Sequence, residues 1–472
     1  MRLRAALAAG LALPLPLWAH GFDERHALPA PLAHFVIGAV LAVALSFLLA
    51  LLFARRASGT AAAPALHAPP RAELRLPAAL AVALRGLGLL VFLVTVAAAL
   101  AGSADPLMNL APTLVWIGWW LGLSLLAAFV IDLWPLLDPW ATLFDAGQAA
   151  ARRLGRPQGL APGWRWPAAL GCWPAALLLL AWSWFEVVYP LAAVPRRLGV
   201  AALGWSAITL AGMGCFGRAQ WRRNGDLFAI YFGLLGRMAP LALDAPHGRI
   251  ALRAPGAALA DGQGAELPAG GPAFVLAMLS TVLFDGLHAG SAWPWFEGLL
   301  QRLLHVPAVD GLVAGTLGLL AVWLLFLAAY AITCIATAAL ASGLPAVAIA
   351  RSFAPTLVPI AVGYTIAHNF TSLVDQGQAL LALASDPFGW GWNLLGTAQL
   401  HIRSGLVDAG TTWNVAIAMV VAGHCAGVWL SHRVAQRLRL PLRATLPLVA
   451  LMLAYTAASL AVIADPIASY SP

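Results

Sequence analysis

The chain has 472 residues, of which 61% are hydrophobic and only 10% are charged. Soluble domains carry about 25% charged and about 45–50% apolar residues, so this composition excludes a soluble enzyme and a disordered chain. Apolar runs of about 20 residues, the length that crosses a bilayer, recur along the whole sequence. The net charge of +8 comes from 27 basic residues, all arginine, which lie mostly between these runs. That arrangement is typical of membrane topology determinants and argues against a nucleic-acid partner.

Residues 1–19 have the features of a signal peptide. Two arginines precede a short apolar stretch, and the sequence LWA, which ends at Ala19, approximates a cleavage site. Cleavage there would leave His20 at the amino terminus of the mature chain, whereas an uncleaved segment would act as an anchor. Residues 20–472 are then expected to form a single polytopic membrane domain.

Ten membrane-spanning helices are predicted after this segment, so the expected fold is an all-α helical bundle in the bacterial inner membrane. Their approximate ranges are 32–54, 78–101, 112–134, 167–187, 198–217, 271–289, 311–341, 355–384, 412–432 and 445–464. The predicted inner segments contain 19 arginines and the outer segments contain 5. This asymmetry places both mature termini on the periplasmic side.

The longest inner insertion covers about 218–270. Its middle part is apolar and is expected to form an interfacial or re-entrant helix, and the segment from about 249 is expected to form a short hairpin. Residues 138–155 have the spacing of an amphipathic helix.

Ionisable residues inside the predicted spans are the main candidates for function, because a charge in a bilayer is costly. Six of them lie in the outer half or near mid-depth: Glu186, Asp285, His288, His368, Asp375 and His424. They would converge in an outward-facing cavity, or each would be hydrated or hydrogen-bonded separately. In the inner half, the sequence indicates only Arg85 and Asp132, as a structural pair or with Arg85 extending to the inner surface. This imbalance favours a one-sided outer site.

Spacing groups some of these residues on common helix faces. Asp285 and His288 are three positions apart and share a face, so they can ligate one metal ion, or the carboxylate can orient the imidazole. His424 is flanked by small residues that let another helix approach closely. It is a candidate for a metal or proton role, and a packing histidine is the alternative.

His368 and Asp375 are seven positions apart, which again places them on one helix face. Asn369 and Gln376 repeat this spacing on the neighbouring face. Such a polar stripe is expected to face the interior of the bundle, where it would serve a site or helix–helix hydrogen bonding.

A free His20 would combine an α-amine with an imidazole. These two nitrogens form a bidentate chelator that suits copper or zinc. The alternative is an ordinary solvated amino terminus.

The chain resembles a group of bacterial integral membrane proteins known as fenitrothion hydrolases. The resemblance rests, in order along the chain, on HGFDERHALPAP, APTLVWIGWWLG, DLWPLLDPWATLF, NGDLFAIYFGLLGRMAPL, STVLFDGL, SFAPTLVPIAVGYTIAHNFTSLVDQGQ and VAGHCAGVWLSHRVA. It implies hydrolysis of the aryl ester bond of an organophosphorus triester, with release of a nitrophenol. The resemblance supplies no catalytic residues, and members more often carry Tyr where this chain has Asn369.

Phosphotriester hydrolysis at neutral pH needs an activated water and an electrophile at the phosphoryl oxygen, and a divalent transition metal supplies both. We therefore predict a zinc or copper site. Its expected ligands are Asp285, His288, His368 and His424, with His20 as a further ligand. Asp375 is then the general base or an orienting group.

The main alternative is a protein that handles copper or another metal, or a secondary transporter that relays protons through the same groups. A copper oxidase that uses the terminal histidine is a third possibility. The expected partners are the lipid bilayer and a small hydrophobic substrate or a metal ion. The sequence specifies no oligomeric state.

Overall fold

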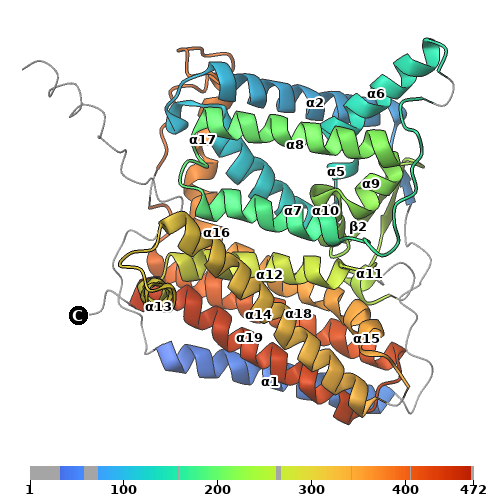
Figure 1. The fold of residues 1–472 in the computed structure, drawn as a ribbon, viewed down its shortest axis with the longest axis vertical. Helices are drawn as coiled ribbons and strands as arrows, with labels where there is room; N and C mark the ends of the chain where they lie inside the picture. The colour runs from blue at the N-terminus through green and yellow to red at the C-terminus, as the bar shows by residue number, and fades with distance from the viewer. Residues whose placement is uncertain are drawn as a thin grey trace, which may run out of the picture.

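The structure, a computed structural model, describes residues 32–57, 73–156, 159–261, 267–341, 343–403 and 405–468. Over these residues the chain forms a bundle of helices that lie side by side, with one small sheet at one end (Figure 1). The predicted all-α polytopic bundle is confirmed. The predicted signal peptide, residues 1–19, and His20 lie outside the described residues.

Ten helical segments correspond to the ten predicted spans. They are α1 (Leu32–Ala57), α2 (Ala78–Ala101), α3 (Leu110–Thr113) with η2 (Leu114–Leu123) and α4 (Ser124–Phe129), α7 (Trp173–Ser183) with η3 (Trp184–Val188), α8 (Pro195–Phe216), α12 (Gly271–His288), α14 (Gly311–Leu340), α15 (Ala346–Phe353) with η4 (Ala354–Leu357) and α16 (Val358–Gly377), α18 (Ala409–Arg437), and α19 (Leu442–Ala468). Within the described residues, eight are long and apolar enough to cross a membrane, and α1 and α7–η3 contain shorter apolar stretches.

The remaining elements connect these helices. They are β1 (Glu73–Arg75), η1 (Pro106–Met108), α5 (Trp134–Leu137), α6 (Pro139–Arg153), α9 (Arg218–Asn224), α10 (Leu227–Gly236), β2 (Leu241–Asp244), β3 (Arg249–Leu252), α11 (Ala257–Ala260), α13 (Ala292–Leu304) and α17 (Ala379–Ser385). The chain crosses from end to end at each span, so η1, α13 and α17 gather at one end of the bundle. We call this end the outer face, because it carries few arginines, and the opposite end the inner face.

The spans are stacked in layers (Figure 1). Helices α2 and α8 pack together at one side, and α1, α18 and α19 pack together at the other. Helix α12 lies between them and contacts α7, α14 and α16. Its central place matches its burial, since Phe274, Leu276 and Phe284 are each 0% exposed. Residues of α12 that are polar are therefore held in the interior of the bundle.

Helices α16 and α18 approach closely because glycines replace larger side chains at their contact. A Cβ atom added at Gly363 would lie 2.4 Å from the carbonyl oxygen of Met419, and one at Gly423 would lie 2.6 Å from that of Pro359. The small residues around His424 therefore allow α18 to approach α16 closely, as the sequence predicts.

The inner side contains the insertion predicted at about 218–270. The hairpin begins earlier than predicted: β2 precedes the predicted segment and pairs with β3, which is the first part of that segment, whereas its last part forms the short helix α11. Strand β1 pairs antiparallel with β3. Helix α10 is buried, not interfacial, since Phe228, Phe232 and Leu235 are at most 2% exposed. The predicted amphipathic helix is α6.

Arg85 of α2 lies 3.7 Å from Asp145 of α6. The structure therefore pairs Arg85 with a residue of the amphipathic helix instead of with Asp132. The Asp132 carboxylate accepts a hydrogen bond from the backbone N–H of Trp134 at 2.9 Å. It thus fixes the start of α5.

Candidate functional site

A cavity of about 280 Å³ opens among η2, η3, α12 and α16 in the outer half of the bundle. Residues of the outer-face connections, such as Leu107, Ala192 and Ile402, form its rim. Polar side chains from different spans line its interior: Ser183, Glu186, Tyr231, Thr281, Asp285, Thr365, Asn369, Ser372 and Gln376. Mostly apolar walls with a few convergent polar groups are typical of small-molecule sites.

A polar contact at this cavity joins Asp285 of α12 to His368 of α16. The His368 Nε2 atom lies 2.9 Å from the Asp285 Oδ2 atom, and the two side chains are only 8% and 13% exposed. A carboxylate removed from water needs a donor, and the imidazole N–H supplies one. The pair forms a carboxylate–imidazole dyad whose carboxylate lines the cavity.

A second carboxyl group, that of Glu186 in η3, lines the same cavity. It lies close enough to Asp285 for the two carboxyl groups to interact electrostatically, and Trp120 lines the same cavity. Two carboxyl groups from different spans therefore face one cavity of low polarity.

Tyr364 and Gly286 close the wall behind the dyad. The Tyr364 ring stacks on the His368 ring with centroids 6.2 Å apart. A Cβ atom added at Gly286 would lie 2.8 Å from the Tyr364 hydroxyl oxygen. The glycine therefore lets α12 approach α16 closely enough for Asp285 to reach His368.

The polar stripe predicted on α16 faces this cavity. Asn369 and Gln376 both line it, together with Thr365 and Ser372 from the same helix. The Asn369 side-chain amide donates a hydrogen bond to the Thr365 carbonyl oxygen at 3.1 Å. The stripe thus faces the bundle interior, as its spacing indicates.

The structure does not gather all the predicted site residues around the dyad. His288 lies at the end of α12, with its ring 4.6 Å from that of Trp293 between centroids. His424 is 1% exposed, and its Nδ1 atom lies 2.8 Å from the Val420 carbonyl oxygen, within the same helix. Asp375 does not line the cavity, and its Oδ2 atom lies 3.5 Å from the backbone nitrogen of Gly405.

Asp285 and His368 are suitable ligands for a divalent metal. Among the described residues, however, no group of three or more His, Cys, Asp or Glu side chains could hold a metal ion. The dyad therefore provides two donor groups of the predicted site, and His20 lies outside the described residues.

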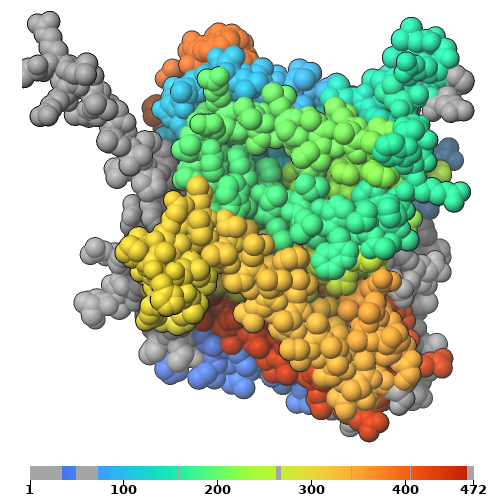
Figure 2. Space-filling model, viewed as in Figure 1, coloured from blue at the N-terminus to red at the C-terminus, as the bar shows by residue number. Residues whose placement is uncertain are grey.

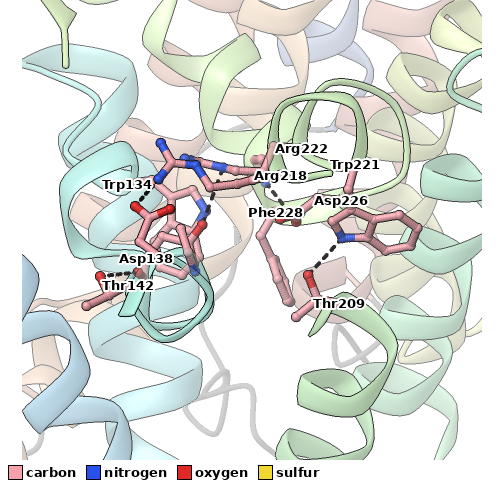
Figure 3. A network of polar contacts seen from close by, with 12 residues as sticks. Trp134, Asp138, Thr142, Thr209, Arg218, Trp221, Arg222, Asp226 and Phe228 are labelled. Carbon is pink, nitrogen blue, oxygen red and sulfur yellow. Dashed lines mark hydrogen bonds and ion pairs between the residues drawn. The ribbon is translucent and has the colours of Figure 1, made fainter. Parts of the chain in front are cut away.

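A second cluster, on the inner side, contains residues that the sequence analysis did not select (Figure 3). Asp138 and Asp226 are each 1% exposed. The Oδ1 atom of each accepts backbone N–H groups at the start of a helix, α6 and α10 respectively. The Arg222 Nε atom lies 3.4 Å from the Asp138 Oδ2 atom. Arg222 is thus paired with Asp138, and its charge also acts on the Asp226 carboxyl.

Burial raises the pKa of the Asp226 carboxyl from 3.8 to about 7, and the nearby charge of Asp138 raises it further in the same direction. Burial also raises the pKa of Asp138, against the opposing effect of Arg222. A proton held between these carboxyls reduces the cost of an uncompensated buried charge. The inner side is thus able to bind a proton.

This cluster lies deep in the bundle. A Cβ atom added at Gly88, in the middle of α2, would lie 2.1 Å from the carbonyl oxygen of Leu137, the residue before Asp138. The expectation that only Arg85 and Asp132 supply charge in the inner half is therefore wrong. One feature of the sequence pointed to these residues: each aspartate directly precedes a helical segment that begins with apolar residues, as N-capping residues do.

Comparisons with known proteins add no assignment. No protein-family model, curated protein or solved structure matches the chain.

Proposed function

We propose that the protein hydrolyses small, uncharged aryl phosphotriesters in the outer cavity. The observation that carries this proposal is the Asp285–His368 dyad, whose carboxylate lines a cavity with apolar, aromatic and amide walls. The resemblance to fenitrothion hydrolases supports the same substrate class. On this proposal the chain lies in the bacterial inner membrane with the cavity open to the periplasm.

Asp285 is the group placed to act as the general base. His368 donates a hydrogen bond to the carboxylate and so holds it in position at the cavity wall. Asp285 takes a proton from water, the water oxygen forms a bond to phosphorus, and the bond from phosphorus to the aryl oxygen breaks. The electron pair leaves with the nitrophenolate. The side-chain amide of Asn369, which lines the same cavity, would donate a hydrogen bond to the phosphoryl oxygen.

A divalent metal, zinc or copper, would strengthen this chemistry by polarising the phosphoryl group. Asp285 and His368 would hold it, with His20 or another group outside the described residues as a further ligand. Hydrolysis and metal binding can therefore be measured independently of each other.

The test uses full-length protein purified in detergent and a p-nitrophenyl dialkyl phosphate, with nitrophenolate absorbance as the readout. We expect turnover by the wild type and losses of about 10²–10⁴-fold in Asp285→Asn and His368→Gln, the usual contribution of a general base. His247→Gln, at an exposed position of the inner hairpin, should retain full activity. No turnover by folded wild-type protein, with or without added zinc or copper, overturns the hydrolase proposal.

Metal analysis of the same samples by mass spectrometry separates the two forms of the mechanism. Stoichiometric zinc or copper that is lost in His368→Gln supports a metal-assisted dyad. Full activity after removal of all metal by a chelator supports the dyad alone.

Proton-coupled transport is the second candidate, and the inner cluster of Asp138, Arg222 and Asp226 favours it. Buried or partly buried carboxyl groups then lie in both halves of the bundle, as a proton relay across the membrane requires. The test is proton uptake into proteoliposomes, followed by a pH-sensitive dye, upon addition of a triester or Cu²⁺. Proton uptake that follows addition of the substrate and is abolished in Asp226→Asn supports transport. Uptake that stays at the background rate after the substrate is added excludes transport.

A further inference from the structure

A second cavity, of about 620 Å³, lies beside the first. It is bounded by α2, α5, α7, η3, α8 and η2, and aromatic rings form much of its wall. We call it the lateral cavity. Its volume lies in the usual range of ligand sites, about 300–1,000 Å³.

The lateral cavity opens sideways between spans. Figure 2 shows a hollow between α8 and α7. In this view the long axes of the spans run across the picture, as Figure 1 shows. Its opening therefore points at right angles to the spans, in the direction of lipid for a chain that crosses a bilayer. The outer cavity differs, since its rim is formed by the outer-face connections.

The wall of the lateral cavity is almost entirely carbon. The Nε1 atoms of Trp134, Trp182 and Trp205 are covered by other protein atoms, and that of Trp140 donates to the Ser206 hydroxyl at 2.8 Å. Among the described lining residues, Thr95 carries the only hydroxyl, which donates to the Val91 carbonyl oxygen at 2.7 Å. Water needs about 2–4 polar partners to occupy a cavity, and this wall does not supply them.

We propose that the lateral cavity binds one acyl chain of a bilayer lipid. A dry, carbon-lined space of this size forfeits packing contacts unless an apolar molecule fills it. The hydrocarbon region of the bilayer lies at its opening and supplies acyl chains in large excess. A polar or charged molecule would lose its hydration there without compensation.

A layer of aromatic side chains separates the lateral cavity from the outer cavity. Trp116 lines the outer cavity and Phe185 the lateral one, and their rings stack with centroids 6.1 Å apart. The lipid site is therefore distinct from the proposed hydrolytic site, and it does not depend on that proposal.

Gly204 offers a direct test, because it lines the lateral cavity and a Cβ atom there would meet no heavy atom within 4 Å. Gly204→Phe should place its ring in part of the cavity, and the open space at the Cβ position lets it do so without a clash there. Gly214→Phe is the matched control, since Gly214 lies on the same helix, also has open space around its Cβ position, and does not line the cavity. Thermal unfolding in detergent verifies that both variants fold.

The probe is a phosphatidylcholine with a photoactivatable diazirine in one acyl chain, reconstituted with the full-length protein in vesicles. After irradiation, mass spectrometry measures labelling of the peptides that contain Phe92 and Trp205. We expect both peptides to be labelled in the wild type and in Gly214→Phe, with at least about fivefold less labelling in Gly204→Phe.

Equal labelling in the two variants, or none at these peptides in the wild type, overturns the proposal. Competition identifies the occupant further. If excess p-nitrophenyl triester removes the label and excess unlabelled phosphatidylcholine does not, the occupant is a small lipophilic molecule and the lipid assignment is wrong. Loss of label with the unlabelled lipid alone supports it.

Discussion

Asp285 and His368 are 83 positions apart in the sequence, yet their Oδ2 and Nε2 atoms lie 2.9 Å apart between two central spans. The contact depends on Gly286, where the α12 backbone meets the hydroxyl of Tyr364. A histidine and a carboxylate held in this way act as one unit, and several consequences can be measured.

The two members of the dyad should be strongly non-additive in catalysis. If Asp285→Asn and His368→Gln each remove the same oriented unit, the double variant should be no more than a few-fold slower than the slower single variant. The measurement is kcat/KM for triester hydrolysis in all four proteins. Multiplicative losses would show that the two residues act separately.

Removal of the inner guanidinium should destabilise the fold. Arg222→Ala leaves the Asp138 carboxylate buried without its ion-pair partner, which costs about 3–5 kcal/mol for a buried pair. Arg223→Ala, at the next position and exposed to solvent, is the matched control and should unfold close to the wild type. Thermal unfolding in detergent measures both, and addition of Asp138→Asn should recover part of the loss in Arg222→Ala.

The stability of the protein should fall with rising pH through Asp226. Its folded pKa of about 7 lies above the ordinary value of 3.8, so the folded state retains a proton that the unfolded chain has released. The stability that this bound proton contributes is fully present below the pKa of Asp226 in the unfolded chain. It is lost as the pH rises through the folded-state pKa of about 7. Asp226→Asn keeps an N-capping side chain and should flatten the melting temperature between about pH 5 and 8.

Asp408→Asn is the control for this experiment. Asp408 caps α18, and hydrogen bonds from Thr411 hold the pKa of its carboxyl below the ordinary value. The stability that the Asp408 carboxylate contributes is fully present above the pKa of this group in the unfolded chain. It is lost only as the pH falls through the lower pKa of the folded state. The variant should therefore leave the slope above pH 5 unchanged. An equal flattening by both variants would contradict the role assigned to Asp226.

The contact between α16 and α18 should tolerate no added methyl group. Gly363→Ala places a Cβ atom 2.4 Å from the Met419 carbonyl oxygen, and such overpacking costs about 1–3 kcal/mol. Gly86→Ala, in α2, meets no heavy atom within 4 Å and should be neutral or slightly stabilising. Comparison of their melting temperatures checks this, and equal values would mean that the helices can separate without cost.

The orientation of the bundle can be tested with two introduced cysteines. Arg302 lies on the outer helix α13 and His247 lies in the inner hairpin, and both positions are exposed. If the outer face is periplasmic, an impermeant maleimide added to spheroplasts should label the Arg302→Cys variant at once. It should label the His247→Cys variant only after lysis. The opposite order would reverse the orientation inferred from the arginines.

Hydropathy was sufficient to predict the spans, because about 20 apolar residues have few stable structures other than a membrane helix. Spacing along α16 was sufficient to place Asn369 and Gln376 on an interior face. It was not sufficient to find the partner of Asp285, because His288 is nearer in sequence and His368 lies on another helix. Which helices face each other is decided by packing, and hydropathy carries no information on it.

The inner cluster was missed for a different physical reason. Asp138 and Asp226 lie outside the predicted spans, at the start of segments that the sequence predicts as amphipathic or interfacial helices at the inner surface. Their carboxylates cap short helices that enter the bundle, so local capping and tertiary burial coincide at each residue. A search for N-capping aspartates before apolar helical segments would have selected both.

The π-helical segment η2, Leu114–Leu123, has a consequence for how the two cavities arose. Its wider winding, with bonds from residue i to i+5, lets Trp119 border the lateral cavity while Trp116 and Trp120 border the outer one. A π-helical turn holds about one residue more than an α-helical turn, so deletion of one residue would restore ordinary winding while the helix beyond the segment keeps its orientation. The rings inside the segment would shift relative to the two cavities. The wall that Trp116, Trp119 and Trp120 form therefore depends on the winding of this segment as well as on their identity.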